Sequence, residues 1–301
     1  MNNQENTSFR RKIIELHISL RAGSFGGQGN TKVVTGLPVK VKVEKCGPPD
    51  KPKATVEVAG MRYEDMEALT TLAFEPLRNA HNTITVLAGS EGEELSQVFS
   101  GEITESAADF SGAPDIWWKA DVMTGYVASI TPQGPSIIQG DQPVADFIAQ
   151  QAKLAGFSFK NNGVTARLKN SVFSGSPVEQ ARAAAREVGA ELLMDDSTWT
   201  LNPKGGAAAT QGTTVLLSKD SGLIGYPAIT SKGVDCKALY NPAFKLGEYV
   251  KVESVVPKAT GLWRIVKLSH ELHAFCPDGG PWESSLTCYS PNVPDDDKGT
   301  K

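Results

Sequence analysis

A two-residue alternation of apolar and polar side chains constrains the fold of this chain more than any other feature. In "VKVKVE" the residues Val39, Val41 and Val43 alternate with charged residues, and "IIELHISL" places four apolar side chains on one side in the same way. This period is that of a β-strand with one buried and one solvated face. Similar runs follow as "ATVEVAG", "NTITVLAG", "QVFSGEIT" and "DIWWKADVM", separated by Gly, Pro, Asn and Ser. The spacing predicts an antiparallel barrel or sandwich.

One helix is expected within this first β region. In "YEDMEALTTLA" the residues Met66, Leu69 and Ala73 recur at helical spacing, and such a helix would close one end of a barrel. We therefore predict a first β-barrel domain with one helix over residues 9–137.

The period changes over residues 138–206, where two helices are predicted. The first, in "GDQPVADFIAQQAKLAG", has Asp141 as its expected N-cap, Pro143 in its first turn and Leu154 on its apolar stripe. The second, in "SPVEQARAAAREVG", has Ser176 as N-cap and Glu179 completing a capping box. Short strands with Asn-Gly and Asp-Asp-Ser turns surround them, which predicts a small α+β module.

Strand patterns resume after a Gly- and Ala-rich linker at 205–212. The runs "TTVLLSK", "VDCKALY", "EYVKVESVV", "GLWRIVKLSHELH" and "WESSLTCYS" predict a second β-barrel domain over residues 207–291, followed by a mobile polar tail at 292–301. The predicted fold class is thus mainly β with an α+β insert. Two β units in one chain suggest a structural duplication.

Charge and composition argue against several classes of protein. The net charge of −4 gives no basic footprint, so specific binding to nucleic acid is not expected. No run approaches the roughly 18 consecutive apolar residues of a membrane span, and no signal peptide is recognisable, so folding in a cytoplasm is expected. The cysteines are scattered without a CxxC pair, which predicts four free thiols.

No motif in the chain predicts catalysis, a cofactor or a metal. The Gly-rich stretch 22–32 lacks the Gly-Lys-Ser/Thr ending of a P-loop and is expected to be a hairpin loop. His270 and His273 are three residues apart on a predicted strand, whereas a zincin motif needs helical spacing of four. The carboxylate pairs 195–196 and 93–94 fall in predicted turns, where acidic residues are common. We therefore expect a protein that is not an enzyme.

The adjacent residues Trp117 and Trp118 are expected to point to opposite faces of one strand. Trp118 alternates with Ile116, Ala120 and Val122, which indicates a core position. Trp117 would then point away from this core, which makes it a candidate for an interface with another protein.

The order of these features resembles the baseplate hub proteins of contractile-tailed bacteriophages. The resemblance extends over about residues 9–290, and its most specific blocks are "IGYP" and "NPAFKLGEYVKVES". It implies a homotrimer in which two related barrels per chain form a ring of six, which joins the sixfold tail tube to the threefold central spike. The expected partners are the tail tube and spike proteins, with tape-measure and baseplate wedge proteins as further neighbours. The expected location is the tail baseplate of the virion, assembled in the host bacterial cytoplasm.

A small set of residues is expected to form subunit or partner contacts. Asn241, Pro242 and Gly247 would fix a turn before the strand "EYVKVES", and Phe244 would supply apolar surface beside it. Phe25, in the Gly-rich loop, and Trp117 complete the set. Loops on β scaffolds often contact partners.

Other functions remain open on the sequence alone. Another tail part, such as a distal-tail ring or the hub of a related injection machine, would have similar strand patterns. A tail-borne cell-wall hydrolase would need a carboxylate or Cys-His pair in a cleft. A glycan-binding module would use surface Trp and Tyr side chains.

Overall fold

The computed structural model describes residues 10–27, 29–70, 81–203 and 214–290. They divide into two compact units. Unit 1 contains Met1–Val43, Lys53–Met123 and His270–Trp282, and unit 2 contains Glu44–Pro52, Thr124–Ser269 and Glu283–Lys301. We describe each unit by itself.

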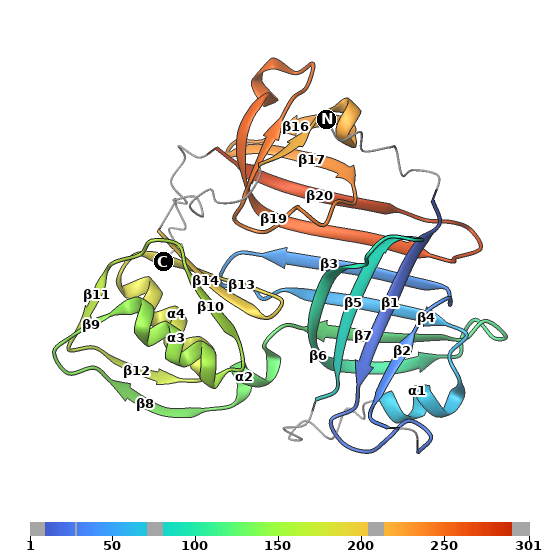
Figure 1. The fold of residues 1–301 in the computed structure, drawn as a ribbon, viewed down its shortest axis with the longest axis horizontal. Coiled ribbons are helices and arrows are strands. Elements are labelled where there is room, and N and C mark those ends of the chain that lie inside the picture. The colour runs from blue at the N-terminus through green and yellow to red at the C-terminus, as the bar shows by residue number, and fades with distance from the viewer. Residues whose placement is uncertain (1–9, 28, 71–80, 204–213, 291–301) are drawn as a thin grey trace. The chain divides into compact units, whose positions relative to one another are not determined.

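Unit 1 is built on seven strands and one helix (Figure 1). The strands are β1 (Lys12–Ser19), β2 (Thr31–Val34), β3 (Val39–Cys46), β4 (Lys53–Ala59), β5 (Thr83–Ser90), β6 (Ser96–Asp109) and β7 (Trp117–Met123). Their hydrogen-bonded order is β3-β4-β7-β6-β5-β1-β2. The pairs β1–β2, β1–β5, β5–β6, β6–β7 and β4–β7 are antiparallel.

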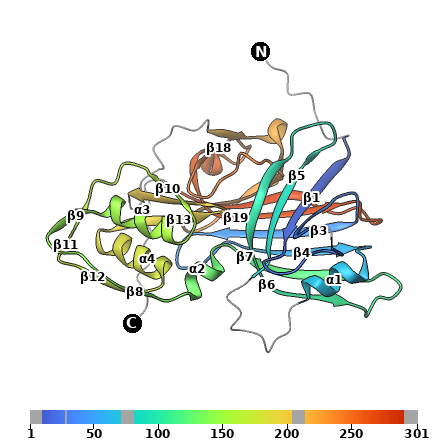
Figure 2. The same ribbon diagram turned by 60° about the horizontal axis from the view of Figure 1, so that its bottom comes forward.

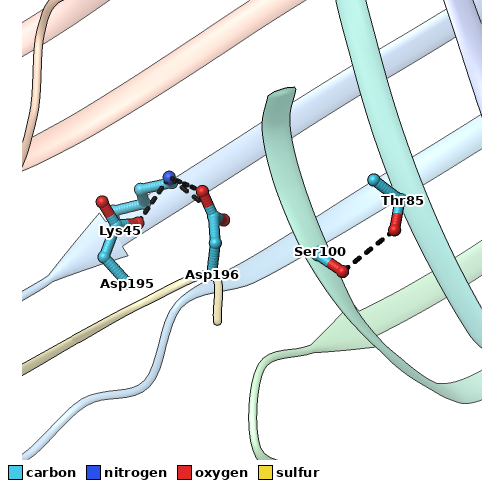
Figure 3. Close-up of polar contacts among 5 residues, drawn as sticks. All are labelled: Lys45, Thr85, Ser100, Asp195 and Asp196. Atoms are coloured by element: carbon cyan, nitrogen blue, oxygen red, sulfur yellow. Dashed lines mark hydrogen bonds and ion pairs between the residues drawn. The ribbon is translucent and has the colours of Figure 1, made fainter. Parts of the chain in front are cut away.

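The predicted alternation is confirmed in the core of unit 1. Val39, Val41 and Val43 are each at most 1% exposed, while the lysines between them face outward. Trp118 is fully buried in β7, as its alternation with apolar neighbours predicts. On the solvated side of β5 and β6, the hydroxyls of Thr85 and Ser100 lie 3.0 Å apart across the strand pair (Figure 3). Cross-strand pairs of this kind add to the stability of a sheet.

The predicted helix forms as α1 (Tyr63–Leu69) and packs along β6 (Figure 2). Its Met66 and Leu69 are buried, and the Ser106 hydroxyl of β6 donates a hydrogen bond to the Leu69 carbonyl. Ala73, expected on the same stripe, lies outside the described residues.

The α+β part of unit 2 contains three helices and several short strands (Figure 1). The helices are α2 (Tyr126–Ile130), α3 (Val144–Leu154) and α4 (Pro177–Glu187). The strands are β8 (Gln133–Ile137), β9 (Asp141–Pro143), β10 (Ser158–Asn161), β11 (Arg167–Lys169), β12 (Val172–Gly175), β13 (Ala190–Asp195) and β14 (Thr198–Pro203). Helices α3 and α4 pack side by side on a shared core with the sheet β10-β14-β13, and Trp199 of β14 is fully buried there.

The two predicted helix starts have different outcomes. The capping box of α4 is confirmed, because the Ser176 hydroxyl accepts from the Glu179 amide and the Glu179 carboxylate accepts from the Ser176 amide. The prediction that Asp141 caps α3 is wrong. Asp141 belongs to β9, where its carboxylate binds Arg167 at 2.7 Å, and Pro143 occupies the N-cap. Leu154 was also expected on the buried stripe, but it is 60% exposed in the last turn.

The β part of unit 2 contains six strands. These are β15 (Val215–Leu217), β16 (Leu223–Ile229), β17 (Gly233–Leu239), β18 (Tyr249–Val252), β19 (Gly261–Ala274) and β20 (Trp282–Tyr289). The last five residues of β19, from His270, and the first residue of β20, Trp282, belong to unit 1. Short 3-10 helices lie at Lys219–Ser221 and Pro257–Ala259. The order is β16-β17-β20-β19-β18-β15, with β15 and β18 parallel. The core beneath them includes Phe244, Val250, Leu268 and Leu286.

The mainly β class and the α+β part are therefore confirmed. Within each unit the described strands form an open row, so closure into two barrels stays a prediction. The three-part division at residues 137 and 206 also stays a prediction.

A buried lysine binds two carboxylates inside unit 2 (Figure 3). Lys45, near the end of β3, is 5% exposed, and its Nζ lies 2.6 Å from Asp195 Oδ1 and 3.2 Å from Asp196 Oδ2. Burial alone would lower the pKa of Lys45, but the two carboxylates outweigh it and raise the pKa above its ordinary 10.5. A buried cation needs such partners, because an unpaired one costs several kcal/mol. The cluster ties the segment Glu44–Pro52 to the β13–β14 turn.

Replacing Trp118 with alanine tests the core of unit 1. We expect Trp118→Ala to lower the free energy of unfolding by about 3–5 kcal/mol, because it removes a fully buried side chain and leaves a cavity. Trp117→Ala, at the half-buried neighbouring position, should cost less than half as much. Urea unfolding measures both, and equal losses would contradict the assigned faces of β7.

Replacing Lys45 with methionine tests the carboxylate cluster. We expect Lys45→Met to destabilise the fold by about 1–3 kcal/mol at neutral pH, because the carboxylates of Asp195 and Asp196 lose the cation that they share. The loss is limited because both carboxylates remain partly solvated. The control variant Lys160→Met, at an exposed position of strand β10 in the same unit, should change the free energy of unfolding by less than about 0.5 kcal/mol.

The same variant predicts a pH dependence. Because the folded pKa of Lys45 is raised, its stabilising contribution is complete below the ordinary value of 10.5 and is lost as pH rises above it. The stability difference between the wild type and Lys45→Met should therefore be constant from about pH 7 to 9 and shrink above pH 10.5. A difference that does not shrink would show that Lys45 does not stabilise the fold as a cation.

Candidate functional site

The turn expected at an interface begins with Asn241. The Asn241 side-chain oxygen accepts from the Ala243 amide at 2.9 Å, and its backbone carbonyl accepts from the Phe244 amide at 3.2 Å. Pro242 is exposed at the tip, whereas Phe244 is 4% exposed and belongs to the β core of unit 2. The tip is thus accessible to another protein, whereas Phe244 packs in the core beneath the turn.

Gly247 ends this turn in a conformation that only glycine adopts easily. Its φ is +83°, and a Cβ at this position would lie 2.5 Å from Leu193 Cδ1. Glycine is therefore favoured here by the left-handed backbone, and any larger residue would also displace the Leu193 side chain. That Gly247 contacts another subunit stays a prediction.

Phe25 and Trp117, the other expected contact residues, lie in unit 1. Phe25 is 6% exposed in the loop between β1 and β2, and the Lys32 Nζ lies 5.8 Å from the centroid of its ring. This loop is a hairpin connection, as predicted, because β1 and β2 pair antiparallel. Trp117 is half-buried with the Lys40 Nζ 4.5 Å from its ring centroid. Contact of either residue with another chain stays a prediction.

Sequence reasoning missed a series of exposed apolar side chains along β16, an end strand of the β part of unit 2. In β16, Ile224 is 36%, Tyr226 75% and Ile229 55% exposed, and Leu239 on the neighbouring β17 is 52% exposed. Among the described strands β16 pairs only with β17, so its other side has no strand neighbour. We call Ile224, Tyr226 and Ile229 of β16 the β16 edge.

The geometry of β16 explains why a simple alternation pattern does not reveal it. The register with β17 shifts between Ile224 and Ala228, and Gly225 in this bulge has a φ of +69°. Pro227, which has no amide hydrogen, lies inside the strand, as is usual only at sheet edges or bulges. The "IGYP" block contains both the glycine of the bulge and the proline. A proline within a strand pattern is the signal from which an edge strand could have been predicted.

The buried thiols of unit 2 are poor nucleophiles. Burial, with a smaller contribution from Asp235, raises the pKa of Cys236 to about 11. Burial also raises the pKa of Cys288, which faces the same core. Because the thiolate is the reactive form, both act as core residues at neutral pH. Burial, followed by the charge of Asp196, likewise raises the pKa of Tyr240.

The other side chains considered for chemistry are bound in structural contacts. Asp195 and Asp196 bind Lys45, and Glu93 binds Arg10 at 2.8 Å. His270 is 3% exposed, and burial lowers the pKa of His273. No three His, Cys, Asp or Glu side chains gather as a metal site in the described part of the chain. What the surface offers is binding through apolar contacts and an open strand edge.

Among the residues whose structure is described, no helix has the length and apolar character needed to span a membrane.

Solved structures of tail proteins share this fold. A 43 kDa tail protein of prophage MuSo2 from Shewanella oneidensis aligns with a TM-score of 0.59 at 12% identity, over 92% of this chain and 98% of that one. A tail protein from Neisseria meningitidis MC58 aligns with a TM-score of 0.64 at 8% identity, over 93% and 96%. The E. coli c3393 protein, a component of the type VI secretion system, aligns with a TM-score of 0.55 at 10% identity, over 84% and 73%. At such identities the likeness shows the fold.

No curated protein sequence is significantly similar to this chain. The sequence does match the family of the baseplate hub gp41 over residues 16–275. That range runs from within β1 to just past the end of β19 and so includes strands of both units, the α+β part and the β16 edge. The chain belongs to the baseplate hub gp41 family, and it is a structural protein of the phage tail.

Proposed function

We propose that this chain is the subunit of a homotrimeric baseplate hub that joins the sixfold tail tube to the threefold central spike. Family membership supports a place in the baseplate. Each chain contributes strands β1–β7 of unit 1 and β15–β20 of unit 2. Three copies with two β units each would present six β units to a sixfold tube and three identical chains to a threefold spike.

The β16 edge is the single observation that carries the assembly part of this proposal. An edge strand exposes unpaired amide and carbonyl groups, and natural proteins usually protect such edges with charges or cover. This edge instead presents Ile224, Tyr226 and Ile229. An apolar edge of this kind is suited to contact with another chain, and here we propose a second copy of the subunit.

The remaining partners follow from the proposed position in the particle. The tube and spike proteins would bind at the two ends of the trimer, and the tape-measure and wedge proteins would be further neighbours. Assembly would take place in the host bacterial cytoplasm before the tail is complete. The role is structural, with no reaction assigned to the chain.

Replacing Tyr226 with aspartate tests the proposed subunit contact. We expect the wild type to have three times the chain mass of 32.1 kDa by light scattering at several concentrations, or to form a complex with the spike protein that contains three copies of the chain. Tyr226→Asp should weaken this assembly at least about tenfold in dissociation constant, because a charge would be buried against apolar side chains. The control Tyr63→Asp changes a tyrosine that is 63% exposed on α1, outside the β16 edge, and should leave assembly unchanged.

Other outcomes would redirect the assignment. A wild-type chain that stays at 32.1 kDa with the spike protein present would contradict the hub proposal. A mass of six chains would favour a distal-tail ring. The second candidate is the hub of an injection machine, which the likeness to a type VI secretion component favours. Clearing of a bacterial cell-wall suspension would indicate a hydrolase, and binding in a glycan assay would indicate a glycan-binding module.

A further inference from the structure

A hollow of about 820 Å³ lies within unit 2. Its walls include residues 46–50, the segment 182–193 from α4 into β13, residues 264–267 of β19 and the end of β20. Ligand sites in proteins commonly have volumes of about 300–1,000 Å³. The space is therefore large enough for several side chains of another molecule, and we call it the unit 2 hollow.

Part of the wall of the unit 2 hollow is apolar and accessible. Pro48 and Pro49 are exposed, and Val266 and Tyr289 are half-buried. Apolar side chains that remain accessible in a hollow favour an occupant that covers them. A bare inorganic anion such as phosphate would leave them uncovered.

Basic side chains predominate around the same hollow. Two lining residues are acidic, Asp50 and Glu191, whereas five are basic, namely Arg182, Arg186, Lys232, Arg264 and Lys267. Glu191 already forms an ion pair with the buried Arg264. Within the lining, the other four cations therefore share one remaining carboxylate, that of Asp50.

Arg182 and Arg186 lie one turn apart on the same face of α4. Nη1 of Arg182 donates to the Pro49 carbonyl at 2.8 Å, and Nη2 donates to the Asp50 carbonyl at 3.0 Å. The buried Nε of Arg182 has no acceptor in the part of the chain that the structure describes. Burial lowers the pKa of Arg182; the charge of Asp50 opposes this shift, and the charge of Arg186 adds to it. The two guanidinium groups therefore repel each other, and an anion beside them would relieve this repulsion.

Three cations of the lining have no acidic partner. Arg186, Lys232 and Lys267 are exposed and make no ion pair with any residue that the structure describes. They come from α4, from the connection between β16 and β17, and from β19, so three separate segments bring positive charge to one hollow. The whole chain has a net charge of −4, so this excess of positive charge is local. Like charges gathered around a hollow attract a ligand of the opposite charge.

We propose that the unit 2 hollow binds an acidic segment of another protein, in which the carboxylates of Asp or Glu flank an apolar side chain. The carboxylates pair with Arg186, Lys232 and Lys267, and the apolar side chain lies against Pro49 and Tyr289. Exposed ion pairs alone give a weak contact, but burial of one large apolar side chain adds about tenfold or more in affinity. The proposal does not depend on the proposed hub trimer, whose subunit contact involves the β16 edge.

Cross-linking of assembled tails with a water-soluble carbodiimide tests the proposal. This reagent joins a lysine Nζ directly to a carboxylate as an amide, with loss of water to the carbodiimide, only where the two groups are in contact. Mass spectrometry of the digested product identifies both residues. We expect links from Lys232 and Lys267 to Asp or Glu residues of a protein other than this chain, and no such links when the purified chain is treated alone.

Three variants supply the comparison. Arg186→Glu with Lys267→Glu should lower the yield of the Lys232 link at least about tenfold per incorporated chain, because the hollow then repels carboxylates. Lys267→Arg keeps the charge but removes the reactive amine, so it should abolish the Lys267 link and retain the Lys232 link. Lys258→Glu, at an exposed lysine outside the lining, should leave both links unchanged.

Circular dichroism verifies that each variant is folded. The proposal would be overturned if Lys232 and Lys267 formed no links in wild-type tails, or if they were linked only to carboxylates of this same sequence. An unchanged yield of the Lys232 link in the charge-reversed variant would overturn it as well.

Discussion

A β-strand is stable only when its backbone groups are paired and one of its faces is buried, and both units of this protein are organised by that requirement. In unit 1 the row from β3 to β2 satisfies it by alternating buried and solvated side chains over successive antiparallel pairs. In unit 2 the row ends at β16, where a bulge at Gly225 and the imino residue Pro227 interrupt pairing and Tyr226 remains exposed. An edge that combines open backbone groups with apolar side chains is best completed by another chain. The proposed contact between subunits rests on this constraint.

Unit 2 combines a β part with an α+β part, and a few specific contacts join them. Gly247 lies in the turn after Phe244 close to Leu193, and a Cβ at this position would displace the Leu193 side chain. Arg264 of β19 reaches Glu191 of β13. These contacts also line a hollow of about 820 Å³ within unit 2, around which basic side chains outnumber acidic ones.

Much of the fold was predictable because it depends on local patterns. The alternation around Val41 and the capping box at Ser176 both predicted what the structure contains, since period and capping are properties of adjacent residues. The prediction for Asp141 was wrong because it, too, relied on adjacent residues alone. A carboxylate before a helix normally caps it, but here the partner is Arg167, a residue that only the fold brings near.

The candidate site was less predictable for the same physical reason. Lys45 binds Asp195, which lies 150 positions away in the sequence, and no local pattern predicts such a pair. The exposure of Tyr226 depends on β16 being the end of a row, which is a fact of strand order. By contrast, the turn at Asn241 was recognisable from its own residues, although the burial of Phe244 beneath it was not.

Hydrogen exchange of the β16 amides, compared between the dissociated chain and the assembled particle, tests the central claim most directly. If a neighbouring chain completes this edge, the β16 amides that do not already donate within the chain should become protected on assembly, while those of the already paired β5 should not change. Protection that appears elsewhere and leaves β16 exchanging at its original rate would contradict the account.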